Sequence, residues 1–225
     1  LGVKAALNAL EKGRIDIKTV DLIITSTMTP DYLSPATATL IQLALGAQCP
    51  AFDIGAACSG FIFGLSIAKA YIESGTYRRI LFIATEKMSS FLNFQDRASC
   101  VLFGDGAAAC VIDADGDGFD IEDVILGSDG NNAHLIFVPA GGSRLPASQA
   151  TVAENKHFLV LEGKEVFKLA VRRMAHVLEE CLQRNHVSLD DIAYIVPQQA
   201  NIRIIDAIAK NLQCPADKVW STVDK

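Results

Sequence analysis

One cysteine stands where nucleophilic chemistry is favoured. Cys58 follows a short apolar run, 51–54, and small residues surround it from 55 to 60. A helical pattern follows directly, with apolar residues that recur on one face: Phe61, Leu65, Ala68 and Ile72. We therefore expect Cys58 where a strand turns into a helix. The partial positive charge at a helix N-terminus favours the nucleophilic thiolate form of a cysteine placed there. The alternative is a buried structural cysteine, which is common in protein cores.

Composition limits the class of protein. The chain has 225 residues, half of them hydrophobic, and a net charge of -6, which suits one or two compact domains. Mild acidity gives no sign of a nucleic-acid or membrane-surface partner, and no apolar run reaches the ~18 residues of a membrane span. The six cysteines follow no metal-ligand spacing. We expect reduced thiols, a cytoplasmic protein and no metal.

Strands and helices alternate along the chain. We expect strands at 22–26, 51–54, 80–84, near 121–126, 158–161 and 192–196. We expect helices at 2–12, 36–45, 58–74, 163–185 and 202–212. This alternation predicts an α/β fold of layered sheets and helices, with ligands at the carboxyl ends of the strands.

Four segments resemble the β-ketoacyl-acyl-carrier-protein synthase III family in order and separation. They are residues 52–61, 103–107, 163–168 and 196–203. The resemblance covers essentially the whole chain. It implies an α/β, thiolase-like fold of two duplicated halves in five layers, α-β-α-β-α. The halves would be 1–113, which carries the nucleophile, and 119–225, and the protein would form a homodimer.

The resemblance also implies an acyltransferase that initiates fatty-acid synthesis. An acyl group would move from acyl-coenzyme A to Cys58, and malonyl-acyl carrier protein would then lose carbon dioxide and attack the thioester. Acyl-coenzyme A is thus a substrate, and no cofactor is implied. A covalent intermediate divides one difficult transfer into two easier steps, and the Cys58 N–H would stabilise the oxyanion.

Four further residues match substrate-binding positions of the family. Arg97 aligns with an arginine that helps to hold the nucleotide part of coenzyme A. Arg203 aligns with a basic residue that contacts the carrier protein or a coenzyme A phosphate, a task suited to a guanidinium. Phe167 and Asn201 match residues that line the pantetheine tunnel. For each arginine the alternative is a surface ion pair, and residues 104–106 are interpreted as a structural turn near the site.

The chain departs from the family at Gln198, where the motif carries a histidine. That histidine donates to the malonyl thioester oxygen during decarboxylation. A glutamine amide still donates a hydrogen bond, but it does not become cationic near neutral pH. Loss of one such donor typically costs ~10²–10³ in rate. The family's partner asparagine is expected just beyond Lys225, and we interpret the chain, which opens on Leu1, as lacking both termini.

Three functions remain open. The first is a β-ketoacyl synthase III with impaired decarboxylation, and the second is an acyltransferase that does not decarboxylate. The third is a degenerate paralogue that only binds acyl carriers, against which the retained Cys58, Arg97 and Arg203 argue. Gln198 favours the second or third over an efficient condensing enzyme. The loop 30–35 resembles the segment that meets the acyl pocket across the dimer interface, and its Ser34 suggests room for primers beyond acetyl.

Overall fold

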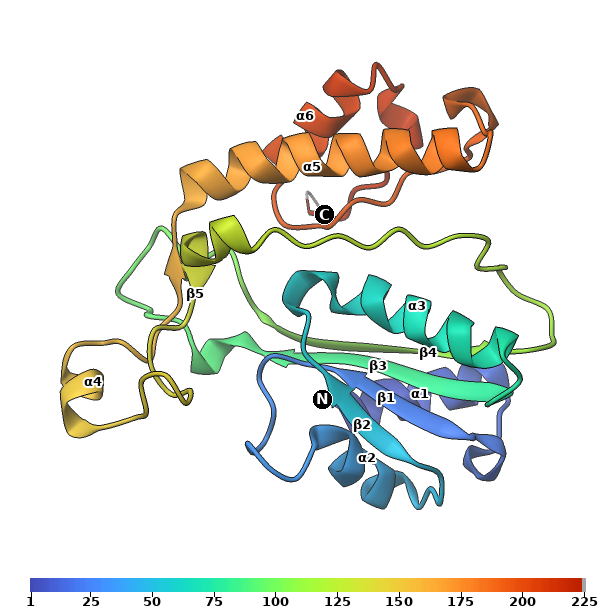
Figure 1. The fold of residues 1–225 in the computed structure, drawn as a ribbon, viewed down its shortest axis with the longest axis horizontal. Helices are drawn as coiled ribbons and strands as arrows, with labels where there is room; N and C mark the ends of the chain where they lie inside the picture. The colour runs from blue at the N-terminus through green and yellow to red at the C-terminus, as the bar shows by residue number, and fades with distance from the viewer. Residues whose placement is uncertain (224–225) are drawn as a thin grey trace. The chain divides into compact units, whose positions relative to one another are not determined.

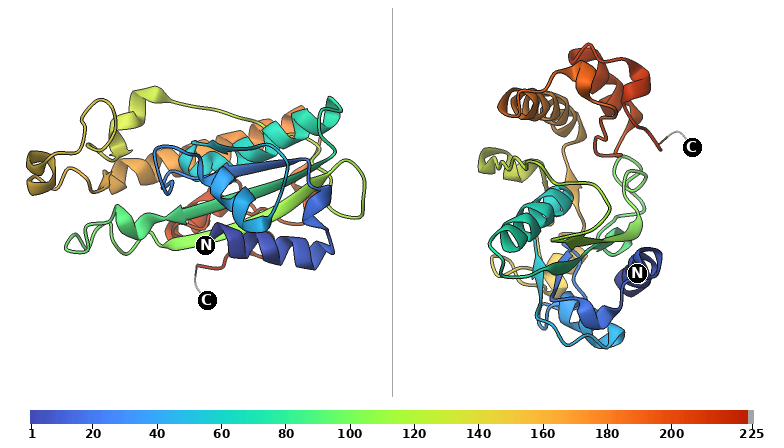
Figure 2. Two further views of the ribbon diagram at one scale, coloured as in Figure 1. Left: turned by 90° about the horizontal axis from the view of Figure 1, so that it is seen from below. Right: turned by 90° about the vertical axis from the view of Figure 1, so that its right-hand side faces the viewer.

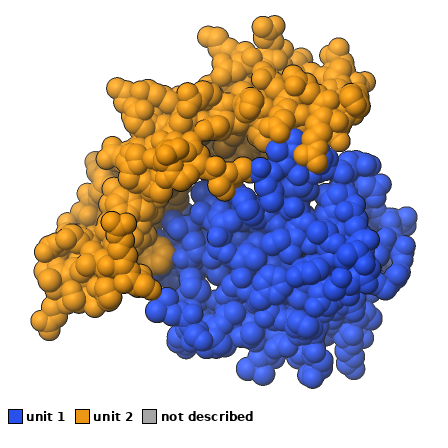
Figure 3. Space-filling model, in the orientation of Figure 1, with its two compact units in different colours: residues 1–90, 104–126 blue, residues 91–103, 127–225 orange. Residues whose placement is uncertain are grey.

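The computed structural model describes residues 1–223, which divide into two compact units. The first unit holds 1–90 and 104–126, and the second holds 91–103 and the chain from 127 onward (Figure 3). Among the described residues no helix is both long and apolar enough to cross a membrane. The family resemblance implies a different division, into two duplicated halves, 1–113 and 119–225, and this division stays a prediction.

A four-stranded sheet forms the centre of the first unit. In spatial order its strands are β2 (Ala51–Ile54), β1 (Leu22–Ser26), β3 (Arg79–Lys87) and β4 (Asp105–Asp113). β1 runs parallel to both β2 and β3, and β4 runs antiparallel to β3. β1 is buried along its whole length, as expected for a strand of a sheet that is covered on both faces.

Helices cover both faces of this sheet (Figures 1 and 2). They are α1 (Gly2–Gly13), α2 (Thr37–Leu45) and α3 (Gly60–Glu73). α1 and α2 share one core with Ile23, Leu81 and Ile83, whereas α3 packs on Ile24 and Phe82 from the other side. This division follows from the strand period, because successive side chains point to opposite faces.

The second unit is built on two packed helices. Its elements are β5 (Ile136–Phe137), α4 (Gln149–Ala153), β6 (Val160–Leu161), α5 (Gly163–Arg184) and α6 (Ile202–Asn211). β5 and β6 form an antiparallel pair. α5 and α6 share a core that includes Ala175, Ile204, Ile205, Ile208 and Leu212.

Several sequence predictions are confirmed and others are wrong. The strands at 22–26 and 51–54 have the predicted bounds, and every predicted helix lies within two residues of an observed one. Three predicted strands are wrong or much shorter, because these segments pair with few backbone groups of another strand within 1–223. Residues 121–126 are irregular, and the strand predicted at 158–161 is reduced to β6. Residues 192–196 form a single bridge, between Ile195 and Val219. The predicted turn at 104–106 is also wrong, since Asp105 begins β4.

Candidate active site around Cys58

Cys58 lies exposed at the turn between β2 and α3. A short 3₁₀ turn, Ala57–Ser59, leads into the helix, and its first residue adopts φ 46°, which is left-handed. Such a conformation costs a non-glycine residue ~1–3 kcal/mol, and strain of this kind is typical of functional sites. Because the thiol is exposed, the alternative interpretation of Cys58 as a buried structural cysteine is wrong, and the sulfur is accessible to a reactant.

Two glycines let α3 approach the sheet closely. A Cβ on Gly60 would lie 1.9 Å from the Oγ of Ser26, and a Cβ on Gly64 would lie 2.2 Å from the ring of Phe82. Together with Ala68 they form the buried face of α3. The predicted face is therefore partly wrong, because Phe61 is 47% exposed. Gly60 serves this close packing, and the packing fixes the helix that begins beside Cys58.

Asn201 and Gln199 hold the segment that carries Gln198. Asn201 is the N-cap of α6, and its Oδ1 accepts a hydrogen bond from the Arg203 backbone N–H at 2.9 Å. The Gln199 Nε2 donates to the carbonyl oxygens of Pro197 at 2.9 Å and Trp220 at 3.1 Å, and its Oε1 accepts from the Thr222 N–H at 2.7 Å. Gln198 itself is exposed. Sequence reasoning missed these hydrogen bonds of Gln199, because Trp220 and Thr222 approach it only in the folded chain.

Both predicted substrate-binding arginines are exposed, and neither makes an ion pair with a residue in 1–223. The surface ion pair is therefore not observed there. Arg203 lies in the first turn of α6, where a cation interacts unfavourably with the helix dipole. Arg97 follows Asp96, whose carboxylate accepts from the Ser99 hydroxyl and the Ala98 N–H, so that the pKa of Asp96 is lowered. These contacts order the turn and leave the guanidinium free.

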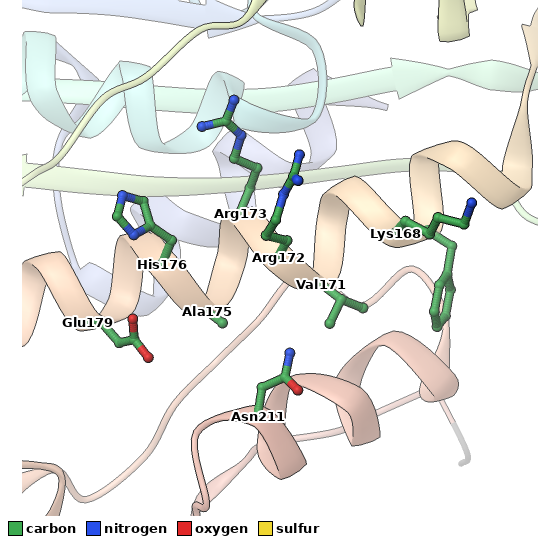
Figure 4. Close-up of a pocket in the computed structure, with 9 residues that line it drawn as sticks. Lys168, Val171, Arg172, Arg173, Ala175, His176, Glu179 and Asn211 are labelled. Atoms are coloured by element: carbon green, nitrogen blue, oxygen red, sulfur yellow. The ribbon is translucent and has the colours of Figure 1, made fainter.

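Phe167 lies on α5 and packs against the core shared with α6. It also lines an open groove of about 850 Å³ in the second unit (Figure 4). Basic side chains border this groove, namely Lys168, Arg172, Arg173 and His176. Arg173 is paired with Asp129, which lowers the pKa of that carboxyl group. Within the described residues no cluster of His, Cys, Asp or Glu side chains is arranged to hold a metal ion.

The predicted site residues are divided between the two units. Cys58 belongs to the first, and the other five belong to the second: Arg97, Phe167, Gln198, Asn201 and Arg203. Within the second unit, the cap contact brings Asn201 and Arg203 together. The roles of all six residues stay predictions.

Comparison with known proteins identifies the family. Residues 52–130 match 3-oxoacyl-[acyl-carrier-protein (ACP)] synthase III, and residues 182–225 match the C-terminal region described for the same synthase. A β-ketoacyl-[acyl-carrier-protein] synthase III of Chlamydia caviae is 51% identical over all of this chain and 68% of its own length. The chain belongs to the β-ketoacyl-acyl-carrier-protein synthase III family.

Solved structures of family members agree with this assignment. The synthase III of Aquifex aeolicus superposes with a TM-score of 0.88 at 37% identity, covering 100% of this chain and 68% of its own. The Thermus thermophilus synthase III superposes with a TM-score of 0.90 at 36% identity, covering 100% of this chain and 69% of its own. These similarities confirm the α/β, thiolase-like fold class. As a synthase III family member, the chain is a condensing acyltransferase of fatty-acid synthesis.

Proposed function

We propose that Cys58 takes an acyl group from acyl-coenzyme A in the first half-reaction. The observation that carries this proposal is the exposed thiol at the strained strand-to-helix turn before α3. The Cys58 thiolate attacks the thioester carbonyl carbon, the bond from that carbon to the coenzyme A sulfur breaks, and coenzyme A leaves as a thiolate. The Cys58 backbone N–H stabilises the transient oxyanion.

In the second half-reaction, malonyl-acyl carrier protein condenses with the acyl-cysteine. The malonyl C–C bond breaks, carbon dioxide leaves, and the resulting enolate attacks the acyl carbon while Cys58 departs as a thiolate. Gln198 donates a hydrogen bond to the enolate oxygen, but its amide does not become cationic. We therefore infer slow decarboxylation. For the same reason Gln198 supports a second candidate, an acyltransferase that does not decarboxylate.

The exposed arginines act on the anionic parts of the substrates. Arg97 holds the nucleotide part of coenzyme A, and Arg203 binds a phosphate or an acidic surface of the carrier protein. Phe167 and Asn201 contact the pantetheine arm. The enzyme works as a homodimer without a cofactor. All six cysteines are free, which supports a cytoplasmic location.

The test measures both half-reactions in one reaction mixture. The protein is incubated with acyl-coenzyme A and malonyl-acyl carrier protein, and coenzyme A, carbon dioxide and β-ketoacyl product are quantified. The proposal predicts one carbon dioxide per product molecule at a low rate. Release of coenzyme A without carbon dioxide would favour the non-decarboxylating acyltransferase. Absence of coenzyme A release would contradict both enzymatic functions.

A further inference from the structure

The segment between β3 and β4 that carries Arg97 is anchored in the second unit. Two of its side chains are buried, Leu92 with 3% of its surface exposed and Ser99 with 2%. The Leu159 N–H donates to the carbonyl oxygen of Phe91 at 2.8 Å, which ties the start of the segment to the residue before β6. The segment therefore has a fixed point on each side of Arg97.

The carboxylate of Asp96 closes a turn around Arg97. Its Oδ1 accepts a hydrogen bond from the Ala98 N–H at 3.0 Å, and its Oδ2 accepts from the Ser99 hydroxyl at 2.5 Å. The Asp96 carbonyl oxygen accepts from the N–H groups of Ser99 at 3.3 Å and Cys100 at 3.0 Å. An aspartate that accepts from the backbone two residues further on fixes a turn of this kind. The backbone of Arg97 is thus held from both sides.

This turn occupies both carboxylate oxygens of Asp96, although a cation follows it in the sequence. The hydrogen bonds from Ser99 and Ala98 lower the pKa of Asp96, so the carboxylate stays ionised and the bonds stay charge-assisted. Arg97 is exposed and makes no ion pair with a residue in 1–223. Asp96 therefore orders the backbone of Arg97 and leaves its guanidinium open to an external anion.

A fixed backbone matters for a long, exposed side chain that has to bind an anion. Binding orders the side chain, and a mobile backbone would add its own loss of conformational entropy. The hydrogen bonds of Asp96 remove the backbone part of this cost before a substrate arrives. A guanidinium gains from such a fixed place, because its donors have a rigid planar arrangement that matches phosphate oxygens.

We propose that Asp96 is a positioning residue that presents Arg97 to the phosphate-bearing nucleotide part of coenzyme A. The inference rests on acylation of Cys58 by acyl-coenzyme A, as proposed above. Asp96 touches no substrate, and its own negative charge opposes the binding of phosphate. When its contacts are lost, Arg97 samples more positions and acyl-coenzyme A binds more weakly, while the chemistry at Cys58 does not change.

The test follows acylation of Cys58 by intact mass in single turnovers and compares two acyl donors. Acetyl-coenzyme A carries the phosphates, and S-acetylpantetheine lacks them. Asp96→Ala raises the half-saturating concentration of acetyl-coenzyme A by at least about fivefold at an unchanged maximal rate, and S-acetylpantetheine is used as by the wild type. The double variant of Asp96→Ala and Arg97→Ala is no weaker than Arg97→Ala alone, because Asp96 acts through Arg97.

Asp96→Asn separates the position of Arg97 from the charge beside it. The asparagine side chain still accepts from the Ala98 N–H and donates to the Ser99 hydroxyl oxygen, so the turn is kept. Its half-saturating concentration of acetyl-coenzyme A equals the wild-type value or falls below it, because a negative charge near the phosphates is lost. Asp16→Ala is the matched control, at an exposed aspartate whose Oδ1 accepts from the Lys18 N–H at 3.0 Å, and it retains the wild-type value.

Three results would overturn the role of Asp96. They are a half-saturating concentration in Asp96→Ala within about twofold of the wild type, an equal rise for both acyl donors, and an equal loss in Asp96→Asn. If the wild type takes up no acetyl group from acetyl-coenzyme A, the proposed function fails and the role of Asp96 fails with it. If the wild type is acylated and Asp96→Ala is acylated equally well, the proposed function survives alone.

Discussion

Gly64 lies against Phe82 so closely that a Cβ on the glycine would be 2.2 Å from the ring Cζ. The phenylalanine is 1% exposed in the middle of β3, so its ring has no free space to enter. Gly60 makes the corresponding contact with Ser26 one turn earlier. The position of α3, and with it the turn at Cys58, thus depends on two glycines, Gly60 and Gly64, which have no side chain.

Gly64→Ala is expected to destabilise the protein by ~1–3 kcal/mol, because the added methyl group overpacks a filled core. Chemical denaturation measures the loss. Phe82→Leu in the same background should recover part of it, since the two positions are coupled. Gly55→Ala is the matched control, because a Cβ there meets no atom within 4 Å. Equal stability of Gly64→Ala and the wild type would show that α3 does not need this close approach.

Gln198→His is expected to raise the rate of condensation by ~10²–10³, since it restores a donor that becomes cationic. The rate of Cys58 acylation should not change, because the role proposed for Gln198 belongs to the second half-reaction. Product formation with malonyl-acyl carrier protein and single-turnover acylation measure the two steps separately. An unchanged condensation rate would mean that Gln198 does not limit decarboxylation.

Arg97→Ala and Arg203→Ala are each expected to raise the KM of their anionic substrate by ~10–100-fold, which corresponds to ~1.5–3 kcal/mol for a hydrogen bond to a charged group. The change in kcat should be small, because neither guanidinium acts on the reacting atoms. Increasing salt should weaken binding in the wild type more than in the variants. Arg144→Ala, at another exposed arginine, is the control. A fall in kcat at constant KM would contradict a binding role.

Asn201 allows its structural and functional roles to be separated. Asn201→Ala should destabilise the protein by ~0.5–2 kcal/mol, because α6 loses its N-cap. Asn201→Asp keeps a cap oxygen and should keep the stability, so that any loss of activity in this variant reports contact with the pantetheine arm. Denaturation and steady-state kinetics on the same two variants provide the comparison. Full activity of Asn201→Asp would limit this residue to capping.

Local patterns explain most of the correct structural predictions. The strand 22–26 contains the β-branched residues Ile23, Ile24 and Thr25, and Gly46 ends α2 in a left-handed conformation, φ 69°. The face of α3 was harder to predict. An apolar pattern counts Phe61 as buried, whereas the sheet requires small residues at Gly60 and Gly64. Such a requirement depends on Ser26 and Phe82, which are distant in the sequence.

The candidate site was only partly accessible from the sequence. The pattern predicted Cys58 at a strand-to-helix turn, and the structure confirms this place and shows that the thiol is exposed. The motifs named Asn201 and Gln198, but a motif does not state which hydrogen bonds a side chain makes. The cap at Asn201 and the hydrogen bonds of Gln199 depend on chain segments that meet only in the fold.

The most direct test of the account is the intact mass of the protein before and after incubation with acyl-coenzyme A. The account predicts a single acyl adduct that is absent in Cys58→Ala and present in Cys100→Ala, a variant at another unpaired cysteine. The adduct should disappear when malonyl-acyl carrier protein is added. A folded wild-type protein that gains no acyl mass, or an adduct that persists in Cys58→Ala, would contradict the assignment of Cys58 as the nucleophile.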